Sequence, residues 1–164
     1  APSGKLPFTY PKFAGDVVHY DRKHTENNDV NFGRNAYQPL FDFGWGMSYT
    51  NFEYSNFEIT RMGDSLMVAK VTVRNSGNYD AKEVVQLYAS DLFASITPSV
   101  KKLIGFKKVM IKKDESVVVE IPFSKAEFTF INKDLKRVFE GGGFTFSLGC
   151  EGFATDEKSY PADA

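Results

Sequence analysis

The sequence predicts an all-β protein whose main part is a seven-stranded antiparallel sandwich of the immunoglobulin or fibronectin type III kind. Apolar and polar residues alternate with a period of two in short runs, and turn residues separate these runs. No segment keeps the period of 3.6 residues that an amphipathic helix requires. The predicted strands cover residues 52–60, 66–74, 83–90, 102–110, 116–122, 127–131 continued at 136–139, and 143–150.

The alternation is clearest in three of these runs. Every second residue is apolar from Met67 to Val73, from Val117 to Ile121 and from Phe144 to Cys150. Side chains two residues apart in a strand share one face, so each run presents one apolar face to a core. The side chains predicted to be buried are Val71, Val73, Leu87, Phe106, Val119, Phe146 and Leu148.

A separate strand is predicted before the sandwich. Leu6, Phe8 and Tyr10 alternate within residues 4–11, and Pro7 restricts such a strand to the end or edge of a sheet, because proline donates no ladder hydrogen bond. No helical layer follows that would cover three large apolar side chains. We therefore expect residues 1–18 to be the terminal strand of a preceding domain, with Leu6, Phe8, Tyr10 and Phe13 exposed as an apolar patch.

Residues 19–48 are predicted to be a linker. The first part is polar and aperiodic, whereas residues 39–50 read PLFDFGWGMSYT. Gly44 and Gly46 permit backbone angles that other residues avoid, so the neighbouring aromatic rings can fold back and anchor the linker on the domain that follows. That domain is expected to span residues 49–151. Residues 152–164 are acidic and small, and we expect a tail there.

Charge and cysteine content exclude several function classes. The net charge of −1 provides no long-range attraction to nucleic acid or to an anionic membrane. No apolar run approaches the roughly 20 residues of a membrane helix. The single Cys150 excludes an internal disulfide and a cysteine-based zinc site, and its place on an apolar face predicts a small buried side chain.

Five sequence blocks occur in the same order as in one enzyme family. The blocks are GKLPFTYP (residues 4–11), FGWGMSYT (43–50), VTVRNSG (71–77), EVVQLYASD (83–91) and KLIGFKKV (102–109). Together they resemble the end of the α/β sandwich domain, the linker and the fibronectin type III-like domain of glycoside hydrolase family 3 β-glucosidases. The chain departs from the pattern at Thr97-Pro98-Ser99, where an Arg-Pro pair is usual, and at residues 112–115, which lack a frequent Pro-Gly. Either departure can alter a surface contact without changing the fold.

This resemblance implies the C-terminal accessory part of a retaining β-glycosidase of carbohydrate metabolism. The expected activity is hydrolysis of terminal non-reducing β-D-glucosyl residues without a cofactor, with β-xylosidase and exo-glucanase as open alternatives. It also implies a periplasmic or secreted enzyme whose barrel and α/β sandwich domains are the partners of this chain. A retaining mechanism needs two carboxyl groups about 5–5.5 Å apart. In the family both come from the preceding domains, and no position here matches either motif. We therefore predict no catalytic, cofactor-binding or metal-binding residue and no activity of this chain alone.

Three groups of residues have a functional interpretation beside a plainer one. The first group offers metal-ligand types, although its spacing fits no common site. A solvated linker is the simpler interpretation, and a loop that borders the substrate cleft of the parent enzyme is a further alternative. The second is a row of lysines, suited to an anionic glycan or to an acidic surface on the catalytic domains. Its simpler interpretation is a solvated strand edge that the lysines guard against aggregation. The third is a set of aromatic residues, suited to stacking on sugars or to packing the linker. These groups are His19, Asp21, His24, Glu26 and Asp29; Lys101, Lys102, Lys107, Lys108, Lys112 and Lys113; and Trp45, Tyr49, Phe52 and Tyr54.

A rival interpretation is a free-standing carbohydrate-binding or adhesion module. Such a module needs an exposed row of aromatic side chains on one sheet face. The strand predicted at residues 4–11 favours the accessory part of a larger enzyme, since an independent module has no use for it.

Overall fold

The computed structural model describes residues 1–23, 39–149 and the backbone of 154–160. Its strands alternate with short turns, and a 3-10 helix η2 (Lys125–Phe128) is inserted after the fifth strand. The strands are β1 (Phe52–Arg61), β2 (Leu66–Asn75), β3 (Ala81–Asp91), β4 (Lys102–Ile111), β5 (Ser116–Ser124), β6 (Phe130–Ile131), β7 (Arg137–Val138), β8 (Gly142–Leu148) and β9 (Ala154–Tyr160).

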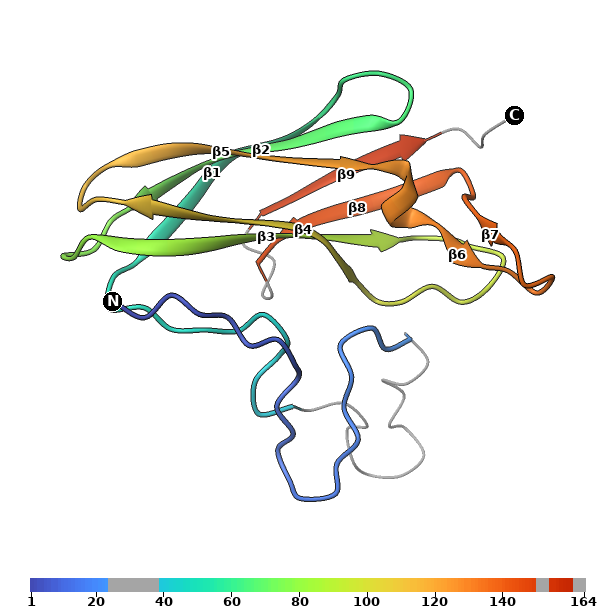
Figure 1. Cartoon of the computed structure of the whole chain (residues 1–164), viewed down its shortest axis with the longest axis horizontal. Coiled ribbons are helices and arrows are strands. Elements are labelled where there is room, and N and C mark those ends of the chain that lie inside the picture. Colours follow the sequence, from blue (N-terminus) through green and yellow to red (C-terminus); the bar gives the residue numbers. More distant parts are fainter. Residues whose placement is uncertain (24–38, 150–153, 161–164) are drawn as a thin grey trace.

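Two antiparallel sheets form the sandwich (Figure 1). One sheet has the strand order β1-β2-β5, the other has the order β4-β3-β8-β9, and β6 pairs only with β7. The predicted all-β antiparallel sandwich is therefore confirmed. Residues 1–23, here called the N-terminal segment, and residues 39–51 lie side by side below the sheet that contains β3 and β4 (Figure 1). The part of the chain that the structure describes has no helix with the length and hydropathy of a membrane span.

Two of the predicted segments differ in the structure. The strand expected at residues 127–131 and 136–139 consists of η2 and the two-residue strands β6 and β7. Their tight hairpin is held by Asn132, whose Oδ1 accepts hydrogen bonds from the backbone N–H groups of Asp134 and Lys136. The segment expected as a tail, residues 152–164, contains β9, which pairs with β8 from Ala154 to Tyr160. Backbone pairing at a sheet edge requires no apolar alternation, so the sequence pattern gave no sign of this strand.

The core lies between the two sheets and is rich in phenylalanine. Rings of Phe123 and Phe146 lie 5.4 Å apart, and those of Phe128 and Phe144 lie 4.9 Å apart, so η2 contributes one wall of this cluster. Burial is confirmed for six of the predicted core residues, namely Val71, Val73, Leu87, Val119, Phe146 and Leu148.

The prediction that Phe106 is buried is wrong, because its side chain is 67% exposed. A β-bulge lies between the pairs Leu87↔Gly105 and Tyr88↔Leu103, and it leaves Ile104 as an extra residue in β4. Ile104 is buried, and a Cβ added at Gly105 would lie 2.7 Å from Ile121 of the opposite sheet. Both residues therefore face the core, so the alternation resumes out of phase and turns Phe106 outward.

Candidate functional site

The N-terminal segment pairs with the end of the linker rather than standing alone. The N–H groups of Leu6 and Tyr10 donate to the carbonyls of Trp45 and Phe41, each at 2.8 Å, and the N–H of Gly44 donates back to Leu6 at 2.8 Å. These bonds join residues 4–10 and 40–46 into a two-stranded unit, here called the N-terminal ribbon (Figure 1).

Glycines let the ribbon approach the sandwich closely. Gly44 has φ +84°, and a Cβ there would clash with the Tyr88 hydroxyl and lie 2.8 Å from Oε1 of Gln86. A Cβ at Gly46 would clash with the carbonyl oxygen of Gly4 in the other half of the ribbon. The first glycine thus sets the contact between ribbon and sandwich, and the second sets the contact within the ribbon.

Aromatic stacking completes this contact. Trp45 stacks on Phe41 with ring centroids 4.1 Å apart, and Tyr20 stacks on Phe43 at 4.2 Å. Phe43 in turn meets the buried ring of Tyr88 edge-on at 6.5 Å. The predicted anchoring of the linker by the aromatic and glycine residues of 39–50 agrees with these contacts.

The junction between linker and sandwich is held by a buried amide. Oδ1 of Asn75 accepts hydrogen bonds from Oγ1 of Thr50 at 2.6 Å and from the N–H of Gly77 at 3.2 Å. Its Nδ2 donates to the carbonyls of Tyr79 and Ile111 at 2.8 and 3.0 Å. Every hydrogen-bonding position of this side chain is used, so the end of the linker is fixed to the β2–β3 turn. An ion pair between Lys5 and Glu83 of β3 ties the ribbon to the sandwich a second time.

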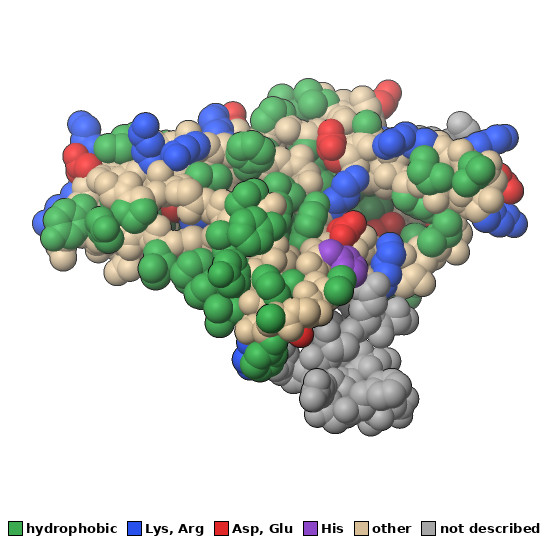
Figure 2. Space-filling model, turned by 60° about the horizontal axis from the view of Figure 1, so that its bottom comes forward, with side chains coloured by type: hydrophobic (Ala, Val, Ile, Leu, Met, Phe, Trp, Pro, Cys, Tyr) green, Lys and Arg blue, Asp and Glu red, His purple; other side chains and the backbone are tan. Residues whose placement is uncertain are grey.

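The outer side of the N-terminal segment is strongly apolar. Exposed fractions range from 45% at Tyr10 to 88% at Val17. Hydrophobic side chains gather across the middle of the face that contains this segment (Figure 2). Leu6, which was expected to be exposed, is half-buried because its backbone bonds to Gly44 and Trp45 place it inside the ribbon. The exposed members, here called the N-terminal apolar surface, are Phe8, Tyr10, Phe13, Val17 and Leu40.

The candidate metal ligands can be judged only where the structure describes them. Among the residues that the structure describes, no group of three or more His, Cys, Asp and Glu side chains is placed to hold a metal ion. His19 and Asp21 are described. His24, Glu26, Asp29 and Cys150 lie outside the described residues, so the interpretations given for them stay predictions.

The lysine row follows β4, which is an edge strand of its sheet. Lys102 Nζ donates to the carbonyl of Glu127 at 2.9 Å, Lys107 Nζ donates to the carbonyl of Glu120 at 3.4 Å, and Lys112 lies 3.9 Å from the Glu115 carboxylate. Charged side chains along an edge oppose pairing with another chain, which agrees with the plainer interpretation of this row.

The four aromatic residues considered for sugar stacking do not form an exposed row. Trp45 is stacked on Phe41, and Phe52 and Tyr54 are partly buried against the core. Of the four, Tyr49 is the exposed one, at 73%. This arrangement favours packing of the linker over a sugar-binding platform.

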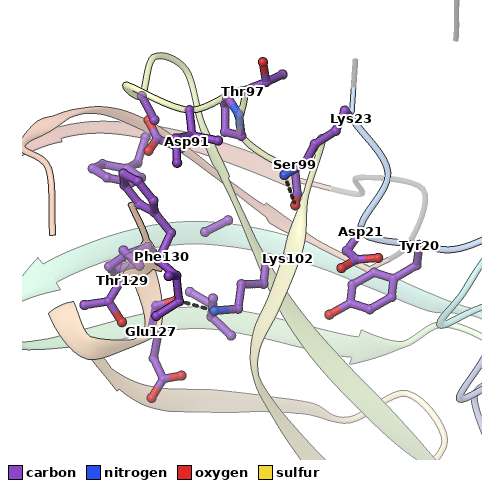
Figure 3. Close-up of a pocket in the computed structure, with 18 residues that line it drawn as sticks. Tyr20, Asp21, Lys23, Asp91, Thr97, Ser99, Lys102, Glu127, Thr129 and Phe130 are labelled. Atoms are coloured by element: carbon purple, nitrogen blue, oxygen red, sulfur yellow. Dashed lines mark hydrogen bonds between the residues drawn. The ribbon is translucent and has the colours of Figure 1, made fainter. Parts of the chain in front are cut away.

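A cavity of about 370 Å³ lies where the N-terminal segment meets the end of the sandwich (Figure 3). Tyr20 and Asp21 approach it from one side, Thr129 and Phe130 line the other, and Lys102 lies between them (Figure 3). Sequence reasoning missed this cavity because its walls come from segments far apart in the chain and carry no local motif.

One carboxyl of this cavity has an altered acidity. Burial raises the pKa of Asp91, and the nearby charge of Glu140 raises it further, while the hydrogen bond from the Phe93 N–H acts in the opposite direction. A single carboxyl of this kind does not make the paired acid and nucleophile of a glycosidase.

Comparison with known proteins identifies the domain and its setting. The family model of the fibronectin type III-like domain matches residues 83–151. A β-glucosidase structure from Erythrobacter marinus superposes with a TM-score of 0.83 at 32% identity, over 97% of this chain and 22% of that one. This chain carries the fibronectin type III-like accessory domain of family 3 glycoside hydrolases.

The curated relatives agree with this family 3 assignment. A lysosomal β-glucosidase of Dictyostelium discoideum is 39% identical over 163 residues, covering 90% of this chain and 19% of the relative. A β-xylosidase of Formosa agariphila is 36% identical over 169 residues, covering 96% of this chain and 23% of the relative. This chain thus spans about a fifth of the length of these two relatives.

Proposed function

We propose that this chain braces the catalytic domains of a retaining β-glycosidase and supplies no catalytic residue itself. The single observation that carries this proposal is the N-terminal apolar surface. The segment that carries it is bonded to the sandwich, and the apolar side chains themselves are exposed to solvent. A surface of this kind on a soluble protein usually marks a contact with another protein surface. The other domains of the same enzyme are the partner that fits, because the relatives are about five times longer than the matched region.

The proposed domain boundaries follow the same logic. Residues 1–18 belong to the end of the preceding α/β sandwich domain, 19–48 are the linker, and 49–151 are the fibronectin type III-like domain. Pairing of β9 with β8 supports extending this domain to Tyr160, into the proposed tail 152–164.

The proposed activity of the complete enzyme is hydrolysis of terminal β-D-glucosyl residues from oligosaccharides. Similarity to several β-glucosidases supports glucose, and similarity to a β-xylosidase keeps xylose as the alternative. Bracing contributes to this reaction by positioning. Two carboxyl groups on separate domains act together only while those domains keep a fixed separation, and a shift of about 1 Å can lower the rate about a hundredfold.

Co-expression tests the proposal. The 164-residue chain is produced together with the preceding part of the same enzyme as a separate polypeptide, and the two are purified through a tag on one of them. We expect a stoichiometric complex. Replacing Phe8 and Phe13 by Ser should weaken the complex, whereas Met62→Ser, a matched change of an exposed residue in the β1–β2 turn, should not. Co-purification unaffected by the Phe8 and Phe13 changes would contradict this function.

A further inference from the structure

The loop between β3 and β4 presents a second exposed apolar group. Phe93 is 83% exposed, the highest value among the aromatic residues described, and its neighbour Leu92 is 46% exposed. A single exposed apolar residue is ordinary on a protein surface. Whether Phe93 is a binding element therefore depends on how firmly the loop holds it and on what it faces.

Hydrogen bonds fix the loop on both sides of Phe93. The N–H of Phe93 donates to Oδ1 of Asp91 at 3.1 Å, and the N–H of Leu92 donates to the carbonyl of Gly143 at 3.0 Å. The carboxylate of Glu140 then accepts both the N–H and the hydroxyl of Ser95, at 2.8 and 2.5 Å. These bonds fix the backbone on both sides of Phe93, which lowers the entropy cost of binding through this loop.

The same loop is joined to the N-terminal segment. The N–H of Val100 donates to the carbonyl of Arg22 at 2.8 Å, and Lys23 and Ser99 form an isolated β-bridge supported by a 3.5 Å contact between Lys23 Nζ and Ser99 Oγ. The loop descends from the sandwich on the side where the N-terminal segment hangs (Figure 1). The loop and the N-terminal segment are therefore neighbours, and residues of both line the cavity.

The cavity shows that the loop and the N-terminal segment are not packed tightly against each other. Residues of both line it, Tyr20 and Asp21 from the N-terminal segment and Asp91 and Ile96 from the strand end and the loop. Figure 3 shows Lys102 at its centre, with Nζ bonded to the carbonyl of Glu127. Because the loop is hydrogen-bonded to the segment that carries the N-terminal apolar surface, a partner that covers this segment can extend to Phe93 of the loop.

We propose that residues 92–101 are a second docking arm for the catalytic domains, with Phe93 as its anchor and Glu140 as the residue that positions it. This inference rests on the proposed function, because the occupant is the same preceding part of the enzyme that covers the N-terminal apolar surface. It adds a contact made by the sandwich itself, so bracing does not depend on the N-terminal segment alone. Aromatic anchors held in place on one partner commonly dominate the energy of such contacts.

Hydroxyl-radical footprinting of the intact enzyme tests this inference, with the 164-residue chain alone as the reference. We expect oxidation of Phe93 in the intact enzyme to fall as far as that of Phe8 and Phe13. Oxidation of Met62 and Leu135, which are 63% and 85% exposed on turns of the sandwich, should be the same in both samples. Protection of Phe8 and Phe13 with undiminished oxidation of Phe93 would overturn the docking arm and leave the proposed function standing. Undiminished oxidation of all three would overturn both.

A variant of Glu140 separates positioning from contact. Glu140→Ala removes both bonds to Ser95 and leaves the exposed area of Phe93 in place, so protection of Phe93 in the intact enzyme should be partly lost. Glu140→Gln retains one acceptor oxygen and should restore part of that protection. Full protection of Phe93 in the Glu140→Ala enzyme would refute the positioning role, and unchanged melting temperatures would show that all variants are folded.

Discussion

Lys5 Nζ lies 2.9 Å from Oε1 of Glu83, and this ion pair joins the N-terminal segment to β3, an inner strand of its sheet. The side chains are 16% and 4% exposed, and the same carboxylate oxygen accepts a hydrogen bond from the Tyr54 hydroxyl at 3.0 Å. A carboxylate removed from water needs such partners. The ion pair therefore ties residue 5, which lies outside the predicted domain boundary at residue 49, to the sandwich.

Replacing Lys5 by Met should destabilise the sandwich, because it leaves the Glu83 carboxylate buried without its counter-charge. We expect a loss of about 3 kcal/mol in the free energy of unfolding, measured by urea denaturation. The double variant Lys5→Met, Glu83→Gln should recover much of this loss, since a neutral amide can still accept the Tyr54 hydroxyl. A Lys5→Met protein as stable as the parent would show that the ion pair is dispensable.

The close contact between the linker and the sandwich at Gly44 can be tested with two glycines that both have a positive φ. Gly44→Ala introduces a Cβ against Tyr88 and Gln86 at φ +84°, whereas Gly15→Ala introduces one into open space at φ +90°. The backbone cost should be about 1–2 kcal/mol in each. Any larger loss in Gly44→Ala reports the steric contact, and we expect faster exchange of the backbone amides of Leu6 and of position 44 in that variant. Equal exchange in both variants would mean that the close approach is not needed.

The assignment of core residues can be tested with two phenylalanines, one buried and one exposed. Phe146 is fully buried, so Phe146→Ala should cost about 3–5 kcal/mol of unfolding free energy by thermal or chemical denaturation. Phe106 faces outward beyond the bulge in β4, so Phe106→Ala should change stability by no more than about 0.5 kcal/mol. Equal losses in the two variants would contradict the register of β4.

These two residues also show what the sequence predicts well. Strict alternation from Phe144 to Leu148 predicts the facing of β8, because a period of two relates every side chain to one sheet face. The same rule fails at Phe106, since a bulge adds one residue and reverses the phase, and Gly105 is the only local sign of it in the sequence of β4. Strand β9 was missed for a related reason, because its pairing with β8 is a backbone contact.

The docking surface was predictable only in part. Tyr10 and Phe13 were expected to be exposed, and Gly44 was expected to anchor the linker, because these features are local in the sequence. The cavity, the Lys5–Glu83 pair and the clamp of Glu140 on Ser95 join residues far apart in the chain. Distant contacts of this kind follow from the folded topology and leave no pattern that a single sequence reveals.

The pKa values of two carboxyls near the β3–β4 loop should be shifted in opposite directions. The hydroxyl and N–H of Ser95 lower the pKa of Glu140 below its ordinary value of 4.5, whereas burial raises the pKa of Asp91 above 3.8. The two hydrogen bonds from Ser95 to the Glu140 carboxylate, here called the Ser95 clamp, should thus be fully formed above pH 4.5. They should be lost as the pH falls through the lowered pKa of Glu140. Ionisation of buried Asp91 opposes folding slightly as the pH rises through its raised pKa.

Carbon-detected NMR titration of the side-chain carboxyls measures both pKa values directly. Protection of the Ser95 amide from exchange, relative to its intrinsic rate at each pH, should fall as the pH drops through the lowered pKa of Glu140, and this step should disappear in Glu140→Gln. A Glu140 carboxyl that titrates at or above 4.5 would contradict the clamp.

Hydrolysis of an aryl β-glucoside tests the central claim that this chain supports catalysis without performing it. The account predicts no turnover above the uncatalysed rate by the purified 164-residue chain, and robust turnover by its complex with the preceding domains. The complex should lose activity when Phe8 and Phe13 are both replaced by Ser, because the catalytic domains then lose their brace. Sustained turnover by the chain alone would contradict the account, since it would require a catalytic carboxyl pair within these residues.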